Sequence, residues 1–247
     1  MNGECGVDMP VTINNTGERI LLDKETPSMV ARHFFAYQFA GGYAGSKNVL
    51  DIACGEGYGS DYLARKADYV AGVDSSAEAI VYAKEKYKNG NLEFYCHDGC
   101  KLEFKDSRFD LICSFQTIEH IFQAGEFLGQ IRRILKSPGT FIITTPNIKD
   151  SSPNSIRPLN KYHLKEYTYD EFKRLLKEYF PDVEIYGLRR TRKHNFFRRL
   201  KKSGILNAIP HTFNPVDRFF KNVTWRDFFI SKEDMENCLD FLAVCRK

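Results

Sequence analysis

The chain is poor in the features that mark several special classes of protein. It has one tryptophan and nine prolines in 247 residues, and no run of about 18 apolar residues is free of charge. Its first residues contain neither an apolar stretch nor a cleavage pattern of the secretory type. These absences exclude a collagen-like or disordered chain and predict no membrane span and no secretory signal. We therefore expect a cytoplasmic protein.

Seven cysteines are present, but their spacing gives neither a zinc site nor a disulfide framework. Cys96 and Cys100 are four residues apart with His97 between them, and no second cysteine pair completes a four-ligand site. No Ser-His-Asp set or metal triad is visible either, so we expect no metal site. Four cysteines fall in apolar, strand-like runs and are expected to be reduced and buried: Cys54, Cys96, Cys113 and Cys245.

What the chain does have is an alternation of two hydrophobic patterns. Continuous apolar runs predict strands over residues 48–53, 68–73, 91–96, 109–115 and 139–145. Between them, apolar residues at three- and four-residue spacing predict helices over residues 60–67, 76–88 and 124–135. Alternating strands and helices predict an α/β fold with a parallel sheet that helices cover on both faces.

The chain divides into a lead-in and a main domain. Residues 1–47 are expected to be a helical lead-in, with the helix at residues 27–40, and residues 48–247 form the main domain. Thr168 and Glu171 have the spacing of a capping box, which predicts that a further helix begins there.

The most informative segment is V-L-D-I-A-C-G-E-G-Y-G-S, residues 49–60, which follows a strand pattern and opens a helix. Three of its residues permit a tight turn and close approach of a ligand to the backbone: Gly55, Gly57 and Gly59. A dinucleotide site wants G-x-G-x-x-G, whereas here the third glycine comes one residue early. Asp51 and Glu56 would also repel a pyrophosphate but tolerate an ammonium or sulfonium group.

Carboxylates also follow the next two strands. Asp74 lies nineteen residues after Gly55, where an acidic side chain can accept two hydrogen bonds from ribose hydroxyls. Asp98 ends the third strand at the same edge of the sheet, where it suits a purine amino group or simply begins a turn before Gly99. The ligand is therefore expected to contain a nucleoside.

These residues resemble the class I S-adenosylmethionine-dependent methyltransferases. The resemblance covers residues 17–187 and 238–247, and it rests on VLDIACGEGYGS, VAGVDSS, the HDG after the third strand, FDLICSFQTIEHI and RRILKSPGTFIITTPN. It implies a Rossmann-like three-layer sandwich with a seven-stranded, mostly parallel sheet whose last strand is antiparallel. It also implies S-adenosyl-L-methionine as the cofactor.

The resemblance implies cofactor contacts along the chain: Asp51 at the amino group, Gly55, Gly57 and Gly59 around the methionine portion, Asp74 and Ser75 at the ribose, Asp98 and Gly99 at the adenine, and backbone near Phe115 closing the pocket. Within the superfamily, TGER, SFQTIEH and YHLKEYTYDEF are similar to small-molecule methyltransferases of polysaccharide and cell-surface gene clusters. Two positions depart from these relatives. Gln116 replaces their usual Glu, and Arg32-His33 replaces Arg-Tyr, so a methionine or substrate contact is expected to differ.

Methyl transfer from a sulfonium is an in-line displacement, so the protein mainly positions the reactants. A general base is needed only for a hydroxyl or a protonated amine. Candidate polar residues follow two strands: Glu119 and His120 come after the fourth, and Asn147, His163 and Glu166 come after the fifth. Of these, the catalytic candidates are His120, His163 and Glu166. His163 and Glu166 could form a base with its orienting carboxylate, or a latch that holds the loop. His120 could contact substrate or only pack at a helix start, which leaves His163 as the best candidate for proton transfer.

A basic segment separates the last two expected strands, at residues 183–188 and 240–245. Within this insertion, residues 189–237, the part from 189 to 226 has eleven Lys or Arg against one acid, Asp217, which gives +10 and leaves −6 for the remainder of a +4 chain. If the two strands are antiparallel neighbours, the insertion leaves the carboxyl edge of the sheet beside the cofactor pocket. It could be a substrate lid that contacts an anionic membrane surface or a phosphorylated substrate. Nucleic acid is the competing partner, and a solvated basic face is the alternative without function.

The sequence therefore predicts a methyltransferase that acts on a small molecule, such as a sugar or a lipid- or nucleotide-linked saccharide. One alternative is an RNA methyltransferase that uses the basic insertion. The other is an NAD-type oxidoreductase, which the glycine spacing and the neighbouring acids disfavour. The lipid-linked substrate would place a cytoplasmic protein at the periphery of the membrane.

Overall fold

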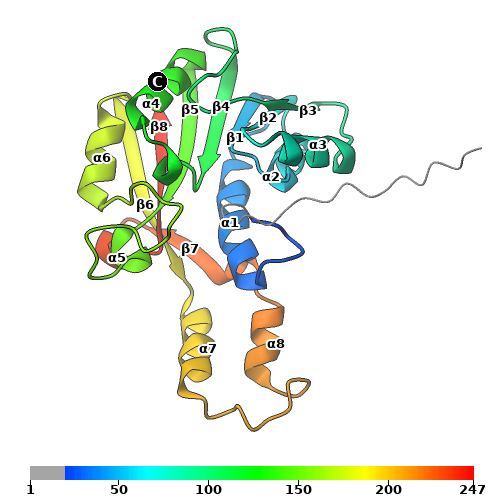
Figure 1. Cartoon of the computed structure of the whole chain (residues 1–247), viewed down its shortest axis with the longest axis vertical. Helices are drawn as coiled ribbons and strands as arrows, with labels where there is room; N and C mark the ends of the chain where they lie inside the picture. Colours follow the sequence, from blue (N-terminus) through cyan, green and yellow to red (C-terminus); the bar gives the residue numbers. More distant parts are fainter. Residues whose placement is uncertain (1–19) are drawn as a thin grey trace, which may run out of the picture.

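The computed structural model describes residues 20–247, which form one eight-stranded sheet flanked by helices (Figure 1). The strand order is β3-β2-β1-β4-β5-β8-β6-β7. The strands are β1 Asn48–Ile52, β2 Tyr69–Asp74, β3 Leu92–Cys96, β4 Phe109–Phe115, β5 Leu135–Pro146, β6 Asp182–Arg190, β7 Phe228–Ser231 and β8 Asp240–Arg246. The first five pair in parallel, whereas β8 runs antiparallel to both β5 and β6, and β7 runs antiparallel to β6.

The helices cover both faces of this sheet. They are α1 Pro27–Ala40, α2 Tyr58–Ala64, α3 Ala77–Lys86, α4 Ala124–Ile134, α5 Ile148–Ser151, α6 Tyr169–Lys177, α7 Arg192–Ser203 and α8 Pro215–Lys221, with short 3₁₀ turns η1 Ile118–His120, η2 Trp225–Asp227 and η3 Met235–Asn237. Alternate residues of β1 divide the core: Leu50 joins the cluster with Phe127 of α4, and Val49 joins the cluster with Leu63 of α2. This side-chain alternation builds the three layers.

The predicted Rossmann-like sandwich, its parallel strands and its antiparallel C-terminal strand are confirmed. The sheet has eight strands rather than the seven expected, because Phe228–Ser231 pairs along β6 as the edge strand β7. A strand of four residues is too short to show a recognisable alternation of apolar and polar residues in the sequence. The expected reduced thiol Cys96 is exposed rather than buried, because it ends β3 at the opposite, uncovered edge.

The helix predicted at residues 27–40 is confirmed as α1, and Thr26 caps it by accepting from the Met29 backbone N–H. Residues 1–19 of the expected lead-in lie outside the described residues. The capping box of Thr168 and Glu171 is present at the start of α6.

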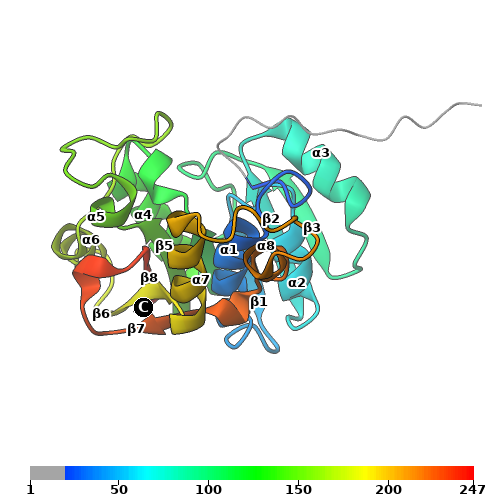
Figure 2. The ribbon, with the colours of Figure 1, turned by 90° about the horizontal axis from the view of Figure 1, so that it is seen from below.

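The basic segment forms a helical hairpin. The helices α7 and α8 project side by side from the carboxyl ends of the strands, next to α1 (Figures 1 and 2). The ring of Phe197 in α7 stacks on Phe219 of α8 at 4.3 Å, so part of the segment's aromatic surface is used to join the two helices. Within residues 20–247, no helix has the length and hydrophobicity to cross a membrane.

Candidate functional site

The turn after β1 presents backbone where β1 and β2 end. Ala53, Gly55 and Gly57 all have positive φ, at 60°, 55° and 89°. The Gly55 N–H donates to Asp74 Oδ2 at 2.9 Å, which fixes the turn against β2. A Cβ on Gly55 would have no atom within 4 Å, so this glycine leaves a ligand room to approach the backbone.

The other two glycines of the loop are pressed against protein. A Cβ on Gly57 would lie 2.8 Å from the Phe94 ring, and one on Gly59 would lie 1.9 Å from the Tyr37 ring. These glycines therefore let the start of α2 sit tightly on α1 and β3. The structure thus gives the three predicted glycines different settings, one open and two packed.

Asp51 is fully buried at the end of β1 and is held by two hydroxyl donors. Ser60 Oγ donates to Oδ2 at 2.7 Å, and Tyr37 Oη lies 3.3 Å from the same oxygen. Burial raises the pKa of Asp51 to about 7, against the opposing effect of these hydrogen bonds. A cation placed beside this carboxylate would relieve the cost of its ionisation.

Asp74 is anchored by backbone and still has acceptor capacity. Each of its oxygens takes one N–H, from Gly55 and from Ser76 at 2.9 Å. A carboxylate oxygen accepts two hydrogen bonds, so both oxygens can also accept from a diol. Ser75 is exposed immediately after Asp74.

Asp98 and Gly99 follow β3 in the predicted turn. Asp98 Oδ1 accepts from the Cys100 N–H at 2.9 Å, and its side chain is exposed. Gly99 lies against Phe127, with a built Cβ 3.4 Å from that ring. Both the turn and an exposed carboxylate are therefore present at this strand end.

The position of Glu56 in the loop predicted that its charge acts on the ligand, but in the structure this charge is paired with protein groups. Its side chain is buried, lies 3.6 Å from Lys86 Nζ and accepts from the Leu22 N–H at 3.3 Å. Because Lys86 compensates its charge, the electrostatic preference of the loop rests on Asp51 and Asp74.

A pocket opens beside the end of β4. Phe115, Gln116 and Thr144 form one side of it, and Arg32 and His33 of α1 form another. Gln116 adopts a positive φ of 52°, and its side-chain amide donates to Thr144 Oγ1 at 3.2 Å. His33 and Gln116, the positions expected to differ from the relatives, therefore line a single pocket.

A buried ion pair spans this pocket. The Arg32 guanidinium donates to both oxygens of Asp240, and the Asp240 side chain is almost fully buried at the start of β8. Burial, together with the charge of Arg32, lowers the pKa of His33 to about 4. His33 is therefore a neutral imidazole at neutral pH.

Arg190 links the basic hairpin electrostatically to this pocket, because its charge interacts with that of Arg32. It ends β6, two residues before α7 begins, and is half-buried. Burial and the nearby charges of Arg198 and Arg32 lower its pKa. Among residues 20–247, no carboxylate lies within salt-bridge distance of its guanidinium. Arg190 therefore lacks the salt-bridged acid that Arg32 has in Asp240.

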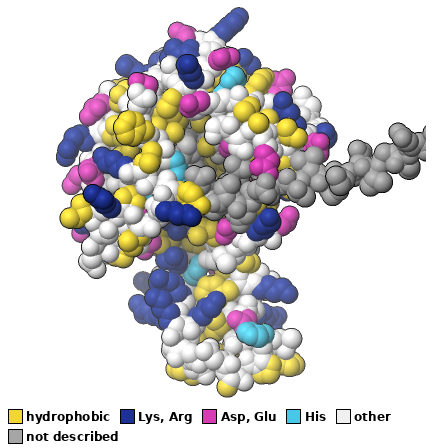
Figure 3. All heavy atoms as spheres, in the orientation of Figure 1, with side chains coloured by type: hydrophobic (Ala, Val, Ile, Leu, Met, Phe, Trp, Pro, Cys, Tyr) yellow, Lys and Arg dark blue, Asp and Glu magenta, His cyan; other side chains and the backbone are white. Residues whose placement is uncertain are grey.

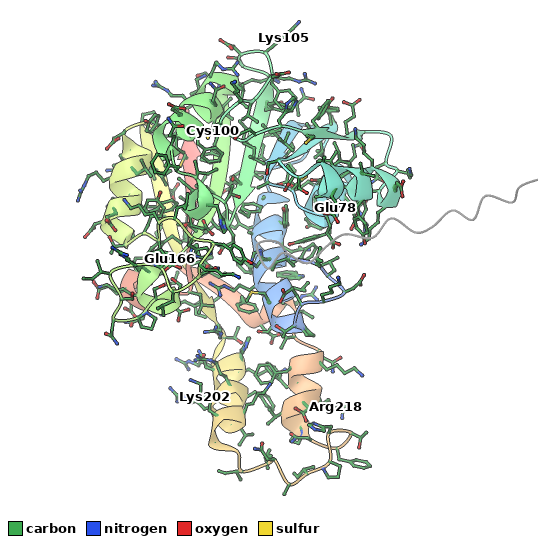
Figure 4. All side chains as sticks on the ribbon, in the orientation of Figure 1. Glu78, Cys100, Lys105, Glu166, Lys202 and Arg218 are labelled. Carbon is green, nitrogen blue, oxygen red and sulfur yellow. The ribbon has the colours of Figure 1, made fainter. Side chains whose placement is uncertain are left out.

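The three catalytic candidates lie together at the carboxyl ends of β4 and β5. The His163 Nδ1 lies 2.6 Å from Glu166 Oε1, and the rings of His120 and His163 are 4.9 Å apart. Glu166 is buried, and Oε2 accepts from Ser151 and Ser152 at 2.6 Å. The expected contact between His163 and Glu166 is thus present, and Glu166 also ties the loop to α5, where Figure 4 labels it.

Both histidines have their Nδ1 directed at an acceptor. The His120 Nδ1 is 3.0 Å from the Tyr162 carbonyl oxygen, and the His163 Nδ1 faces Glu166. A carbonyl can only accept, so the neutral His120 ring carries its proton on Nδ1 and leaves Nε2 unprotonated. The Asn160 side-chain N–H donates to His163 Nε2 at 2.9 Å, which gives that ring the same tautomer.

Glu119, which the sequence places with His120 after the fourth strand, joins these histidines. It is fully buried in η1, and Oε2 accepts from Thr145 Oγ1 at 3.0 Å, whereas Oε1 has no hydrogen-bond partner within residues 20–247. Burial raises the pKa of Glu119 to about 8. One ligand atom from each of Glu119, His120 and His163 lies within 4.8 Å of the others.

Sequence reasoning missed residues that come from distant segments. Tyr37 and Ser60 hold Asp51, and Asp240 holds Arg32 across 208 positions. Only Ser60 had a local signal, since it follows the glycine turn directly. The remaining contacts arise because α1 and β8 both cross the carboxyl edge of the sheet.

Comparison with known proteins identifies the family of this fold and this loop. Residues 44–185, more than half of the chain, match the family described as "Methyltransferase domain". A probable S-adenosylmethionine-dependent methyltransferase of Mycobacterium tuberculosis is 32% identical over 181 residues, which are 72% of this chain and 65% of that protein. This match thus spans somewhat less than two thirds of the relative's length.

Two further comparisons agree. The fatty-acid O-methyltransferase of Mycolicibacterium smegmatis is 31% identical over 117 residues, 46% of this chain and 42% of that protein. The solved structure of an S-adenosylmethionine-dependent methyltransferase from Mesorhizobium loti shares the fold, with a TM-score of 0.61, 15% identity, and coverage of 88% of this chain and 98% of that one. The glycine turn and the two strand-end carboxylates of this chain occupy the matched domain, and the chain belongs to the S-adenosylmethionine-dependent methyltransferases.

Proposed function

We propose that the protein transfers a methyl group from S-adenosyl-L-methionine to a small acceptor that carries an anionic group, such as the phosphate of a nucleotide- or lipid-linked saccharide. The observation that carries the proposal is Arg190, an arginine with no salt-bridged carboxylate among the described residues, whose charge interacts with that of Arg32 in the pocket beside β4. The family membership supports the donor, and the charges around the pocket support the class of acceptor.

The residues at the ends of β1 and β2 fit the donor. Gly55 leaves open space at a positive φ, Asp51 is a buried carboxylate without a nearby cation among residues 20–247, and Asp74 can accept from a diol. We assign the methionine portion to Asp51 and Gly55, and the ribose to Asp74. When bound, S-adenosyl-L-methionine supplies an electrophilic methyl group on a cationic sulfur.

The same residues argue against a pyrophosphate ligand. Both carboxylates would repel it at short range, since two like charges 4 Å apart cost about 4 kcal/mol at the effective dielectric near a protein surface. A dinucleotide fingerprint needs its third glycine one position after Gly59, and Gly59 itself packs against the Tyr37 ring. An NAD-type oxidoreductase therefore remains the weaker reading.

The hairpin supports an anionic acceptor at the pocket more than a broad nucleic-acid surface. Arg190 lies close enough to both Arg198 and Arg32 for their charges to interact, and Arg32 lines the pocket. Figure 3 shows Lys and Arg side chains gathered at the root of the hairpin, near the body of the molecule. The tip instead carries apolar side chains: Ile205 is 74% exposed and Phe213 is 80% exposed. This division suits a phosphate at the pocket with an apolar carrier beyond it.

The acceptor hydroxyl is activated, in this proposal, at the cluster of His120, His163 and Glu166. Glu166 holds the His163 ring with an unprotonated Nε2. His163→Ala is expected to lower kcat strongly and to leave binding of S-adenosylhomocysteine unchanged. A near wild-type rate with intact cofactor binding would remove His163 from the mechanism.

The decisive assay measures release of S-adenosylhomocysteine with matched acceptors: a nucleotide sugar, a polyprenyl-phosphate-linked sugar and the same free sugar. We expect turnover with the phosphorylated acceptors, and Arg190→Gln should raise KM about 10- to 100-fold, because a charge-assisted hydrogen bond contributes about 1.5–3 kcal/mol. The matched control is Lys202→Gln, at the far end of α7 (Figure 4), which should leave KM unchanged.

Three outcomes would contradict the proposal. Equal turnover of the free sugar would remove the role of phosphate, and an unchanged KM in Arg190→Gln would remove the role of that arginine. Transfer to RNA without transfer to any saccharide would establish the RNA methyltransferase instead.

A further inference from the structure

The cluster of Glu119, His120 and His163 at the carboxyl ends of β4 and β5 has the composition of a metal site. Glu119 and His120 come from η1, and His163 comes from the loop before α6, forty-three positions later. Two imidazoles and one carboxylate, with ligand atoms within 4.8 Å of one another, are the donor set of catalytic zinc sites that keep one coordination position open.

Glu119 provides the second, independent observation. Its side chain is 0% exposed, yet Oε1 has no hydrogen-bond partner among the described residues. A buried carboxylate oxygen without a partner carries a desolvation cost that a cation would offset. The single Thr145 hydroxyl at Oε2 does not compensate that oxygen.

The groups behind the histidines fit the same purpose. Metal-binding histidines usually donate their second N–H to a carboxylate or a backbone carbonyl, which fixes the tautomer and the ring orientation. Here the His163 ring has Glu166 behind it at 2.6 Å, and the His120 ring has the Tyr162 carbonyl behind it at 3.0 Å. Glu166 is itself held by two serine hydroxyls, so its position is fixed.

We propose that Glu119, His120 and His163 bind one divalent metal ion of the zinc type, with Glu166 as a positioning residue behind His163. On loading, the His163 Nε2 exchanges its hydrogen bond from Asn160, an exposed loop residue, for a bond to the ion. The sequence predicted no metal site. These three ligands could not be recognised together in the sequence, because only the fold brings them close to one another.

The ion would activate the acceptor at the same cluster, with His163 as a ligand of the ion and not as the base, an extension that rests on the proposed function. A hydroxyl at the open position has its pKa lowered by the ion, as water does in zinc enzymes. The sulfur–methyl bond then breaks with its electron pair left on sulfur, an oxygen–methyl bond forms, and the hydroxyl proton leaves to solvent. No oxidant or reductant takes part.

The test is the binding of Zn²⁺ alone to the full chain after removal of metal with a chelator. We expect one equivalent per chain by calorimetry, with affinity lowered more than 100-fold in Glu119→Gln and in His163→Gln. Glu166→Gln should lower affinity about 10- to 100-fold, as expected for a group behind a ligand. The control is the double variant Cys96→Ser with Cys100→Ser, which removes the other thiol and histidine cluster in the sequence and should leave binding unchanged.

A second measurement needs no variant. Co²⁺ added to the wild-type protein should give the intense visible absorption of a four-coordinate site, and Zn²⁺ should abolish it by competition. Absence of Zn²⁺ binding to the wild-type chain, a six-coordinate Co²⁺ spectrum, or binding that is lost only in the cysteine variant would overturn the proposal. S-adenosylhomocysteine binding is measured on the same metal-free protein, so failure of the metal site is distinguished from failure of the methyltransferase proposal.

Discussion

The turn after β1 and the cluster after β4 and β5 both place carboxylates at the carboxyl edge of the sheet. The two regions differ in how many carboxylate oxygens have a hydrogen-bond donor. Asp51 and Asp74 each accept hydrogen bonds from nearby donors on both oxygens, whereas one oxygen of Glu119 has no partner in the part of the chain that the structure describes. The donors of the first set come from α1, the glycine turn and the residue pair after β2, all within residues 37–76. The second gathers residues from separate loops. The site proposed for the methyl donor, after β1 and β2, is therefore preformed. The site proposed for the acceptor, after β4 and β5, has a buried oxygen that a ligand would satisfy.

The largest effect is expected from crowding the donor side. In Gly59→Ala the new Cβ would lie 1.9 Å from the Tyr37 ring, whose hydroxyl is bonded to Asp51. We expect a destabilisation of about 1–3 kcal/mol or more, with cofactor binding lost because Tyr37 must move. Thermal unfolding and calorimetry with S-adenosylhomocysteine measure both effects.

The matched control is Gly129→Ala in α4, where the new Cβ meets no atom within 4 Å. That variant should be neutral or stabilised by about 0.5–1 kcal/mol, because alanine favours a helix interior over glycine. Equal losses in the two variants would show that the packing of Gly59 is not special.

The next effect concerns the ribose carboxylate. Asp74→Asn removes the charge while keeping one oxygen for the Gly55 N–H. We expect S-adenosylhomocysteine to bind about 10- to 100-fold more weakly, with stability little changed, since a hydrogen bond to a charged group contributes about 1.5–3 kcal/mol. Asp106→Asn, at an exposed acid, is the control. An unaltered dissociation constant in Asp74→Asn would contradict the ribose assignment.

A smaller effect follows from the buried charge of Asp51. Its pKa is raised to about 7 from an ordinary 3.8, so ionisation is disfavoured in the folded state. The unliganded protein should therefore lose stability as the pH rises from about 4 to about 7, and change no further above that. Binding of the cationic donor should conversely weaken as the pH falls below 7, because the carboxylate becomes protonated.

Asp51→Asn should flatten both pH profiles, which unfolding curves and binding titrations between pH 5 and pH 8.5 can show. Profiles that keep their shape in the variant would assign the titration to another group.

The smallest effect is expected at the tip of the hairpin. Phe213→Ser replaces a side chain that is 80% exposed, so stability should change by less than about 0.5 kcal/mol and donor binding not at all. Phe219→Ser, in the ring stack with Phe197, should instead loosen the two helices and lower the thermal midpoint. A tip variant that unfolds like the stack variant would show that the tip is part of the core.

The parts that sequence could predict are those built from local pattern. The glycine turn, Asp74 and the strands next to them follow from residues within one strand, turn and helix, whose periodicities differ. The contact of His163 with Glu166 was predictable because the two residues are three positions apart. β7 was missed because four residues give no pattern.

The remaining site contacts could not be read from the chain. Asp240 reaches Arg32 only because β8 inserts between β5 and β6, and Glu119 meets His163 only because two loops converge below the sheet. Such pairs depend on which strands are neighbours, and hydrophobic pattern does not specify neighbours. The metal ligands are therefore the residues for which structure added most.

The most direct test of the account compares two ligands on the wild-type chain by calorimetry. We expect S-adenosylhomocysteine to bind at one site per chain, Asp74→Asn to weaken this binding, and NAD to show no binding. Binding of NAD in place of S-adenosylhomocysteine, or of neither, would contradict it.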